Sequence, residues 1–208
     1  MHYDSSQLSA FIYSGWLATW PTQLLAAIWI LWLISWVVAS FWSGRTQKHV
    51  MTWDSQAYRL PILAGGILFT PWIEQLLGEK PLWSFGNVGI YVLVALTLAG
   101  ISFTWWARIH LGRFWSNAIT RKEGHRVIDT GPYGFVRHPI YTGLIAGMLA
   151  TGVAVGTVTA ILGAVLISLG MWQKARMEEG FLTNELGAEA YGAYRRRVPM
   201  IVPFMPPR

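Results

Sequence analysis

The segment GPYGFVRHPIYTG at positions 131–143 gathers side chains that could bind a charged ligand. Pro139 suits the first position of a helix, where its missing N–H costs nothing, so we expect a helix to begin there. A proline also disfavours helical geometry in the residue before it, which places His138 at the helix mouth. The free N–H groups and the positive end of the helix dipole at this point favour an anionic group.

Charged and aromatic side chains surround this helix mouth. Arg137 adds a planar guanidinium that can hold a carboxylate through two parallel hydrogen bonds. Tyr133, Phe135 and Tyr141 supply flat surfaces for a purine ring or a cation. The plainer alternative is that Arg137 and His138 only anchor a membrane helix at the interface. The combination of Arg137, His138 and Tyr141 between turn glycines favours a binding site.

A long apolar run separates this segment from a pair of carboxylates. The 34 residues from Pro139 to Trp172 carry no charge. As one helix they would be about 51 Å long, which is too long for a single membrane span. We therefore expect a helical hairpin that turns within residues 151–157. The hairpin returns Trp172 to the membrane level of Pro139, and about 9 Å more of helix brings Glu178 beside Arg137.

The pair Glu178-Glu179 is thus the second half of the predicted site. Adjacent side chains on a helix point about 100° apart, so we expect one glutamate to face the site and the other a neighbouring base such as Arg176. A carboxylate facing a nucleotide can accept hydrogen bonds from ribose hydroxyls or balance a cationic ligand. The alternative is a solvated turn of helix, which is the usual place for such a pair.

Other kinds of catalytic site find little support in the sequence. The chain has no cysteine, which excludes thiolate nucleophiles and disulfides. Its histidines lack metal-ligand spacing, and we predict no metal site. There is no P-loop, no Gly-x-Gly-x-x-Gly motif and no Ser-His-Asp arrangement. The net charge of +6 fits loops facing anionic lipid headgroups, without the motifs of nucleic-acid binding.

Composition identifies the elements that must position these residues as membrane helices. Of the 208 residues 53% are hydrophobic and only 12% are charged, well below the charged fraction of about 25% in soluble domains. Many of the 13 tryptophans lie at the ends of apolar runs, as in interfacial belts. We predict an all-α integral membrane protein of about five transmembrane helices, the last two forming the hairpin, with a cofactor-binding region on the cytoplasmic side.

The predicted spans divide the chain into two regions. Residues 1–107 form an N-terminal membrane region of three helices, at 24–42, 60–77 and 88–107, the second kinked by glycines and a proline. Residues 108–208 form a C-terminal catalytic region containing a basic loop, the hairpin and a polar tail. The pairs Gly143/Gly147 and Gly152/Gly156 would let the hairpin arms approach closely, or would reflect only the frequency of glycine in membrane helices.

Loop charge predicts the orientation. An N-terminus outside and a C-terminus in the cytoplasm put every Lys and Arg except Lys80 on the inner side. In a bacterium the corresponding membrane would be the inner membrane.

The C-terminal half resembles the isoprenylcysteine carboxyl methyltransferase and phospholipid methyltransferase families of integral membrane enzymes. The resemblance covers roughly residues 108–204, about half the chain. The matching pieces are LGRFWS (111–116), GPYGFVRHPIYTG (131–143), the Glu178-Glu179 pair, Tyr191 and Tyr194, and the Val-Pro pairs at 198 and 202.

The resemblance implies a methyltransferase that uses S-adenosylmethionine and an acceptor reaching the site from the lipid bilayer. An isoprenylcysteine carboxylate is the acceptor most in keeping with it, and a phospholipid amine or a small thiol are alternatives. Arg137 and Glu178 would be catalytic, with Arg137 orienting either the donor or the acceptor. The implied cofactor-binding residues are Tyr133, Arg137, His138, Tyr141, Gly143, Glu178 and Glu179.

Two other functions compete with this interpretation. Membrane sterol reductases that use NADPH are similar near the Arg-His-Pro sequence, but after the hairpin they carry an Arg-Asp motif and a Lys-Tyr-Gly stretch. This chain instead has Glu178-Glu179 and Leu186-Gly187-Ala188. A non-catalytic membrane scaffold or lipid-binding protein is the second alternative, and it predicts no affinity for a cofactor.

Overall fold

The computed structural model describes residues 19–41, 46–49, 57–112, 115, 120–122 and 127–206. The first 18 residues, most of the basic loops after Phe41 and Gly112, and Arg113, Phe114 and Ser116 of the 111–116 piece lie outside the described residues. In chain order the elements are α2 (Trp20–Ser40), β1 (Thr46–His49), α3 (Arg59–Leu68), α4 (Pro71–Leu77), α5 (Asn87–Leu111), β2 (Thr120–Lys122), the 3-10 turn η4 (Gly131–Gly134), α6 (Pro139–Val155), α7 (Val158–Leu186) and α8 (Ala188–Arg197).

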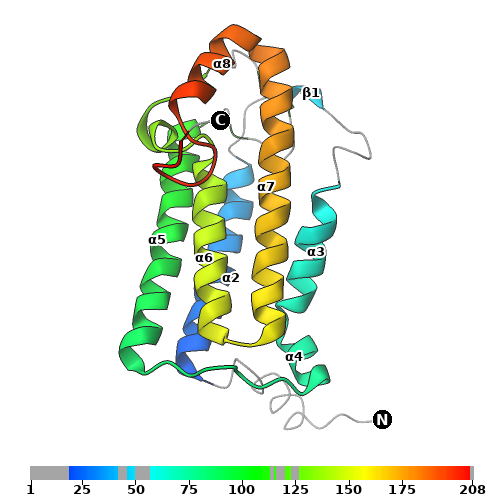
Figure 1. The fold of residues 1–208 in the computed structure, drawn as a ribbon, viewed down its shortest axis with the longest axis vertical. Helices are drawn as coiled ribbons and strands as arrows, with labels where there is room; N and C mark the ends of the chain where they lie inside the picture. Colours follow the sequence, from blue (N-terminus) through cyan, green and yellow to red (C-terminus); the bar gives the residue numbers. More distant parts are fainter. Residues whose placement is uncertain are drawn as a thin grey trace.

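The long helices stand side by side as an upright bundle (Figure 1). Helix α6 packs between α5 and α7, α3 packs on the other side of α7, and α2 packs against α5 and α6. This arrangement confirms the predicted all-α class. The exception is a small antiparallel ribbon in which β1 pairs with β2, joining two loops that the sequence left separate.

The apolar helices fit a membrane, and their lengths differ from the prediction. Helices α2, α5 and α7 are each long and apolar enough to span a bilayer. Helices α3 and α4 meet at a bend of 62° and form a broken span at the predicted kink. The first hairpin arm, α6, has 17 residues and a length of about 25 Å, so it is shorter than the other candidate spans. The structure thus has three or four candidate spans, and a count of five remains a prediction.

The predicted hairpin turn lies between Val155 and Val158. Gly156 takes a left-handed conformation with φ of 76°, which a residue without a Cβ adopts freely. Thr157 caps α7 by accepting a hydrogen bond from the amide of Ala160 at 3.3 Å. The amide of Leu82 donates to the carbonyl of Gly156 at 2.8 Å, so the loop before α5 holds the turn in place.

The glycines of α6 mostly face α5 and not the second hairpin arm. A Cβ on Gly143 would collide with the carbonyl oxygen of Gly100, which explains how α5 and α6 approach so closely. Gly147 faces Trp29 and Thr97, whereas Gly152 faces α7. The prediction that the Gly143/Gly147 pair brings the hairpin arms together is therefore wrong. Because α6 lies against α2, α5 and α7, its small residues are divided among these three helices.

Polar groups inside the bundle fix the helices relative to one another. The indole nitrogens of Trp29 and Trp32 donate to the hydroxyls of Thr151 at 3.0 Å and Thr104 at 3.2 Å, linking α2 to α6 and α5. The fully buried Arg108 donates to the carbonyl of Ala39 at 2.8 Å and holds the end of α2 against α5. Interhelical hydrogen bonds of this kind stabilise membrane bundles.

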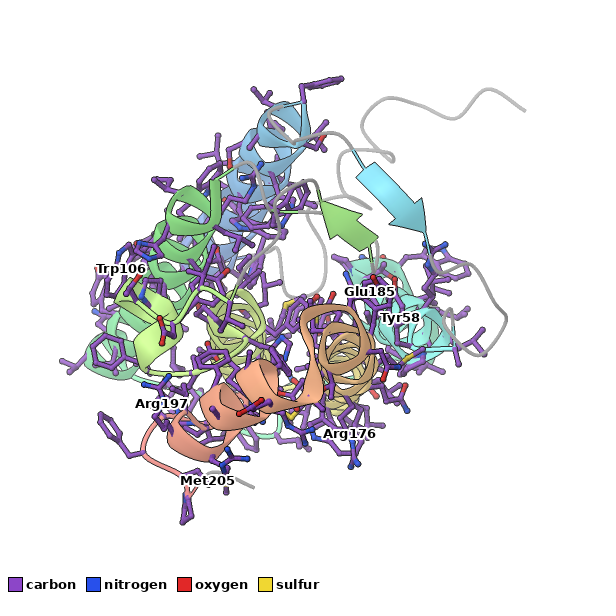
Figure 2. The ribbon with its side chains drawn as sticks, turned by 90° about the horizontal axis from the view of Figure 1, so that it is seen from above. Tyr58, Trp106, Arg176, Glu185, Arg197 and Met205 are labelled. Carbon is purple, nitrogen blue, oxygen red and sulfur yellow. The ribbon has the colours of Figure 1, made fainter. Side chains whose placement is uncertain are left out.

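At the end of the bundle that carries the C-terminus, α8 folds over the other helices (Figure 1). Seen from above, it runs from the end of α7 toward η4 (Figure 2). Tyr191, Tyr194 and Val198 form a small core there, with Val127 and Leu182 packed against it. The exposed Arg197 pairs with Asp129 at 3.0 Å. Helix α8 therefore fixes the polar segment in front of α6.

We predict that Gly143→Ala lowers the thermal unfolding midpoint of the purified protein by an amount equivalent to about 1–3 kcal/mol, because the new methyl group overlaps the Gly100 backbone. Gly66→Ala is the matched control, since nothing lies within 4 Å of the added Cβ in α3 and alanine favours a helix. Equal midpoints for the two variants in detergent would contradict this packing.

Candidate functional site

The C-terminal segment, which is the chain after α8, forms hydrogen bonds with the residues just before α6. The amides of Arg137 and His138 donate to the carbonyls of Pro199 at 2.8 Å and Met200 at 3.0 Å. The hydroxyl of Thr142 donates to the carbonyl of Ile201 at 2.6 Å. The chain that begins with the Val-Pro sequence at position 198 therefore lies along the start of α6 and links it to α8.

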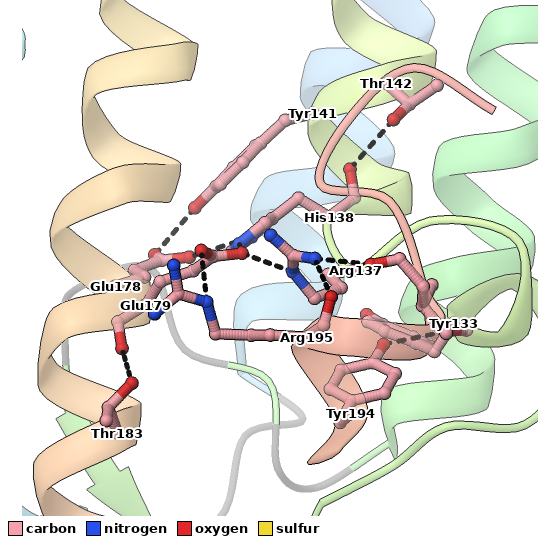
Figure 3. Close-up of polar contacts among 11 residues, drawn as sticks. Tyr133, Arg137, His138, Tyr141, Thr142, Glu178, Glu179, Thr183, Tyr194 and Arg195 are labelled. Atoms are coloured by element: carbon pink, nitrogen blue, oxygen red, sulfur yellow. Dashed lines mark hydrogen bonds and ion pairs between the residues drawn. The ribbon is translucent and has the colours of Figure 1, made fainter. Parts of the chain in front are cut away.

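Helix α6 begins at Pro139 with His138 in the N-cap position, as predicted. His138 has φ of −123° and ψ of 63°, so its backbone is not helical. The geometry directs the imidazole away from α6 and toward α7 (Figure 3). The backbone N–H groups of residues 137 and 138 donate to the chain's own carbonyls, and the anion site expected at the first turn of α6 stays a prediction.

The two halves of the predicted site meet in a buried ion pair. Arg137 Nε donates to Glu179 Oε1 at 2.5 Å (Figure 3), and both residues are 5% exposed. Arg137 Nη1 also donates to the carbonyls of Arg195, at 3.0 Å, and Val198. Arg195 Nε lies 3.4 Å from the second oxygen of Glu179. The Arg137 guanidinium thus connects α7, α8 and the C-terminal segment.

His138 lies between the two carboxylates. Its Nδ1 is 3.6 Å from Glu178 Oε2 and its Nε2 is 3.4 Å from Glu179 Oε1. Its Nε2 is buried and makes no hydrogen bond within the described residues. The Tyr141 hydroxyl donates to Glu178 Oε1 at 2.7 Å, and the Tyr141 and His138 rings stack with centroids 5.5 Å apart. We call Arg137, His138, Tyr141, Glu178 and Glu179 the donor cluster.

Both glutamates contact other residues of the donor cluster, and the neighbouring base that Glu179 also approaches is Arg195 and not Arg176. The Arg176 guanidinium instead lies 5.1 Å above the Trp172 ring. Glu178 and Glu179 point in different directions from α7, but α6 and α8 supply partners for both of them. Glu178 therefore contacts Tyr141 of α6, and Glu179 contacts Arg137 just before α6 and Arg195 of α8, within the same site.

Two of the predicted residues lie outside the donor cluster. Gly143 is buried in the contact between α5 and α6. Tyr133 lies in η4, and its ring stacks on the His110 ring with centroids 6.2 Å apart. Its carbonyl accepts a hydrogen bond from the Tyr194 hydroxyl at 2.8 Å. Burial raises the pKa of the Tyr133 and Tyr194 phenols. Tyr133 and Gly143 thus pack against other parts of the chain, and a role for either in cofactor binding stays a prediction.

Sequence reasoning missed Lys174. This lysine is 8% exposed, and its ammonium lies 5.5 Å from the Tyr141 ring and 5.3 Å from the Tyr58 ring. The signal was its position four residues before Glu178, which places both side chains on one face of α7. Lys174 adds a positive charge beside the donor cluster, on the side of α3.

The arrangement suits binding and orientation of a polar ligand. Its carboxylates, cations and aromatic rings match a ligand that carries both signs of charge, and the cluster contains no serine or cysteine nucleophile. In the part of the chain that the structure describes, no group of three or more His, Asp or Glu side chains is placed to hold a metal ion. Chemistry that depends on proximity and orientation fits this site best.

Known proteins provide an independent comparison. The sequence profile of the isoprenylcysteine carboxyl methyltransferase family matches residues 93–184, which include the whole donor cluster. Protein-S-isoprenylcysteine O-methyltransferase of Schizosaccharomyces pombe is 31% identical over 186 residues, covering 79% of this chain and 77% of that protein. Protein-S-isoprenylcysteine O-methyltransferase B of Arabidopsis thaliana is 29% identical over 160 residues, covering 73% and 76%.

A bacterial relative has a different name. Methanethiol S-methyltransferase 1 of Bradyrhizobium diazoefficiens is 30% identical over 125 residues, covering 53% of this chain and 43% of that protein. The similarity to the Schizosaccharomyces protein extends over most of both chains, and the profile includes both halves of the donor cluster. The chain therefore belongs to the isoprenylcysteine carboxyl methyltransferase family.

Proposed function

We propose that this membrane methyltransferase takes its methyl group from S-adenosylmethionine, bound at the donor cluster. The observation that carries the proposal is the meeting of His138, Tyr141 and Glu178 in a family of methyltransferases. The hairpin brings these residues together from segments 37 residues apart. Bound S-adenosylmethionine supplies a methyl group activated by a positively charged sulfonium.

The donor cluster has groups that match such a donor. Glu178 can accept hydrogen bonds from ribose hydroxyls or from an ammonium group, since its second oxygen is 3.6 Å from His138 and only the first is bonded to Tyr141. The buried His138 Nε2, without a hydrogen bond in the described chain, can bond a polar ligand atom. The stacked rings of His138 and Tyr141 offer an aromatic face to adenine or to a cation.

We assign Arg137 a positioning role. Its Nε bonds Glu179 and its Nη1 bonds the carbonyls of Arg195 and Val198, so the donors on these two nitrogens are already engaged within the protein. Arg137 then fixes Glu179, and through it the position of His138. In this role it orients the donor site indirectly and does not grip the acceptor.

The acceptor that we propose is an isoprenylcysteine carboxylate or a compound like it. Two relatives of this chain are named for isoprenylcysteine and one for methanethiol, so a small thiol is the second candidate and a phospholipid amine the third. A carboxylate is already ionised at neutral pH and needs only orientation toward the methyl group. A thiol or an amine must lose a proton, which His138 or Glu178 would take.

We propose that the acceptor reaches the site from the bilayer, because α2, α3 and α5 expose apolar side chains that would face lipid. We propose the orientation that loop charge predicts, with the donor cluster on the cytoplasmic side and Lys80 outside. If the chain comes from a bacterium, the membrane is the inner one.

We predict that the purified protein binds S-adenosylmethionine and S-adenosylhomocysteine in calorimetry and does not bind NADPH. Glu178→Ala and His138→Ala should each weaken this binding at least about tenfold, because each removes a charged or buried hydrogen-bonding group from the cluster. The matched control is Glu189→Ala, which removes an exposed carboxylate from α8. If both cluster variants bind as the wild type does, the donor lies elsewhere.

Arg137→Gln should destabilise the protein by about 3–5 kcal/mol, because Glu179 stays buried without its main partner. Arg197→Gln is the control, since it breaks an exposed ion pair of the same kind and should cost about 0–1 kcal/mol. Thermal unfolding in detergent measures both effects. A stable Arg137→Gln protein that has lost only donor binding would show that Arg137 contacts the ligand directly.

The absence of cysteine allows a direct test of orientation. A cysteine at Lys80 should react with a membrane-impermeant maleimide in intact cells, because this residue is exposed on the loop that we place outside. A cysteine at the exposed Arg196 of α8 should react only after permeabilisation. The opposite labelling pattern would show that the chain is inserted the other way round.

A further inference from the structure

A groove of about 420 Å³ lies between the start of α3 and α7. Tyr58, Leu60 and Pro61 form one wall, and Trp172 and Arg176 belong to the other. Viewed from above, Tyr58 and Arg176 lie at the part of the bundle where α3 and α7 pack (Figure 2). Arg176 points away from the donor cluster, because two residues of helix rotate it about 200° from Glu178. The Tyr58 wall of the groove instead approaches Lys174, beside the cluster.

Positive charge gathers at the upper end of this groove. The Arg176 guanidinium lies 5.1 Å from the Trp172 ring centroid, and that of Arg59 lies 6.0 Å from the Tyr58 ring centroid. Both arginines are exposed, and neither forms an ion pair within the described part of the chain. The described lining contains no aspartate or glutamate. Arg176 therefore lines the groove and Arg59 lies beside it, between the lining residues Tyr58 and Leu60, with no carboxylate in the described lining.

Below the arginines, each helix continues as an exposed apolar stripe. The stripe residues are spaced by three or four, so each stripe stays on one helix face. They are Leu60, Leu63 and Ile67 on α3, and Val165, Leu169 and Trp172 on α7. Leu60 and Trp172 also line the groove, so both stripes begin in it. A tryptophan beside an arginine at the end of an apolar stripe is typical of the headgroup level of a membrane.

We propose that this groove binds an anionic phospholipid. The phosphate lies between Arg59 and Arg176, and the acyl chains follow the stripes of α3 and α7. Basic pockets between membrane helices bind acidic headgroups in this way. The lipid is a bound partner and not a methyl acceptor, since Arg176 faces away from the donor cluster. The proposal stands on the groove alone and does not depend on the identity of the methyl donor.

The test is a binding titration of the full chain in neutral detergent with a fluorescent short-chain phosphatidylglycerol. We expect unlabelled dioctanoyl phosphatidylglycerol to displace the probe, and dioctanoyl phosphatidylcholine or sodium phosphate at the same concentration to leave it bound. Arg176→Gln and Arg59→Gln should each weaken binding about fivefold, and the double variant about 25-fold. Circular dichroism shows whether the variants keep their helices.

Arg196→Gln is the matched control, because it removes an exposed arginine of α8 that forms no ion pair with the residues the structure describes and does not line the groove. It should change the affinity by less than about twofold. The proposal is overturned if this control weakens binding as much as Arg176→Gln does, or if phosphatidylcholine competes equally. It is also overturned if inorganic phosphate displaces the probe, or if a prenylated cysteine does, since the groove would then hold a free anion or the acceptor.

Discussion

The buried ion pair between Arg137 and Glu179 joins residues 42 positions apart and brings the polar end of the bundle together. Removing two charges from water is costly, and their attraction compensates only when the remaining donors also find partners. Here the Arg137 guanidinium also bonds the carbonyls of Arg195 and Val198, and Arg195 approaches the second oxygen of Glu179. The segment before α6, the end of α7 and the chain after α8 are thereby held in one arrangement.

That arrangement explains how a bundle of apolar helices can carry an ordered polar site. The hairpin of α6 and α7 is held in place by its capped turn and by the close packing of α6 on α5. The end of the hairpin opposite the turn brings His138 and Tyr141 next to Glu178. There the two rings stack and the Tyr141 hydroxyl donates to the Glu178 carboxylate. A site built on two packed helices is positioned more accurately than one built on loops. Such accuracy suits methyl transfer, which depends on the alignment of donor and acceptor.

The sequence predicted the hairpin and the meeting of its two ends because length alone decided them. An uncharged run of 34 residues cannot lie in a bilayer as one straight helix, and folding it back brings Glu178 to the level of Arg137. The start of α6 at Pro139 was also predictable, because proline chemistry is local. The family followed from residue motifs in the same region, and its profile covers that region.

What the sequence could not predict depends on how each helix is rotated about its axis. The glycines of α6 could face α5 or α7 equally well from their spacing, and Lys174 could equally have faced lipid. The partners of Arg137 include backbone carbonyls of residues 195 and 198, which carry no side-chain signal in the sequence. The contact of β1 with β2 joins two loops whose composition only indicated positive charge.

The proposed methyl transfer is tested most directly by measuring whether the purified protein, in lipid vesicles, transfers a radiolabelled methyl group from S-adenosylmethionine to an acceptor. The acceptors are an S-prenylated cysteine with a free carboxylate and the same compound with its carboxylate amidated. We expect a labelled methyl ester, released by base, from the free acid alone, and no product with Glu178→Ala. Absence of labelled product from the free acid and from total lipid extracts, by a protein shown to be folded, would contradict this proposal.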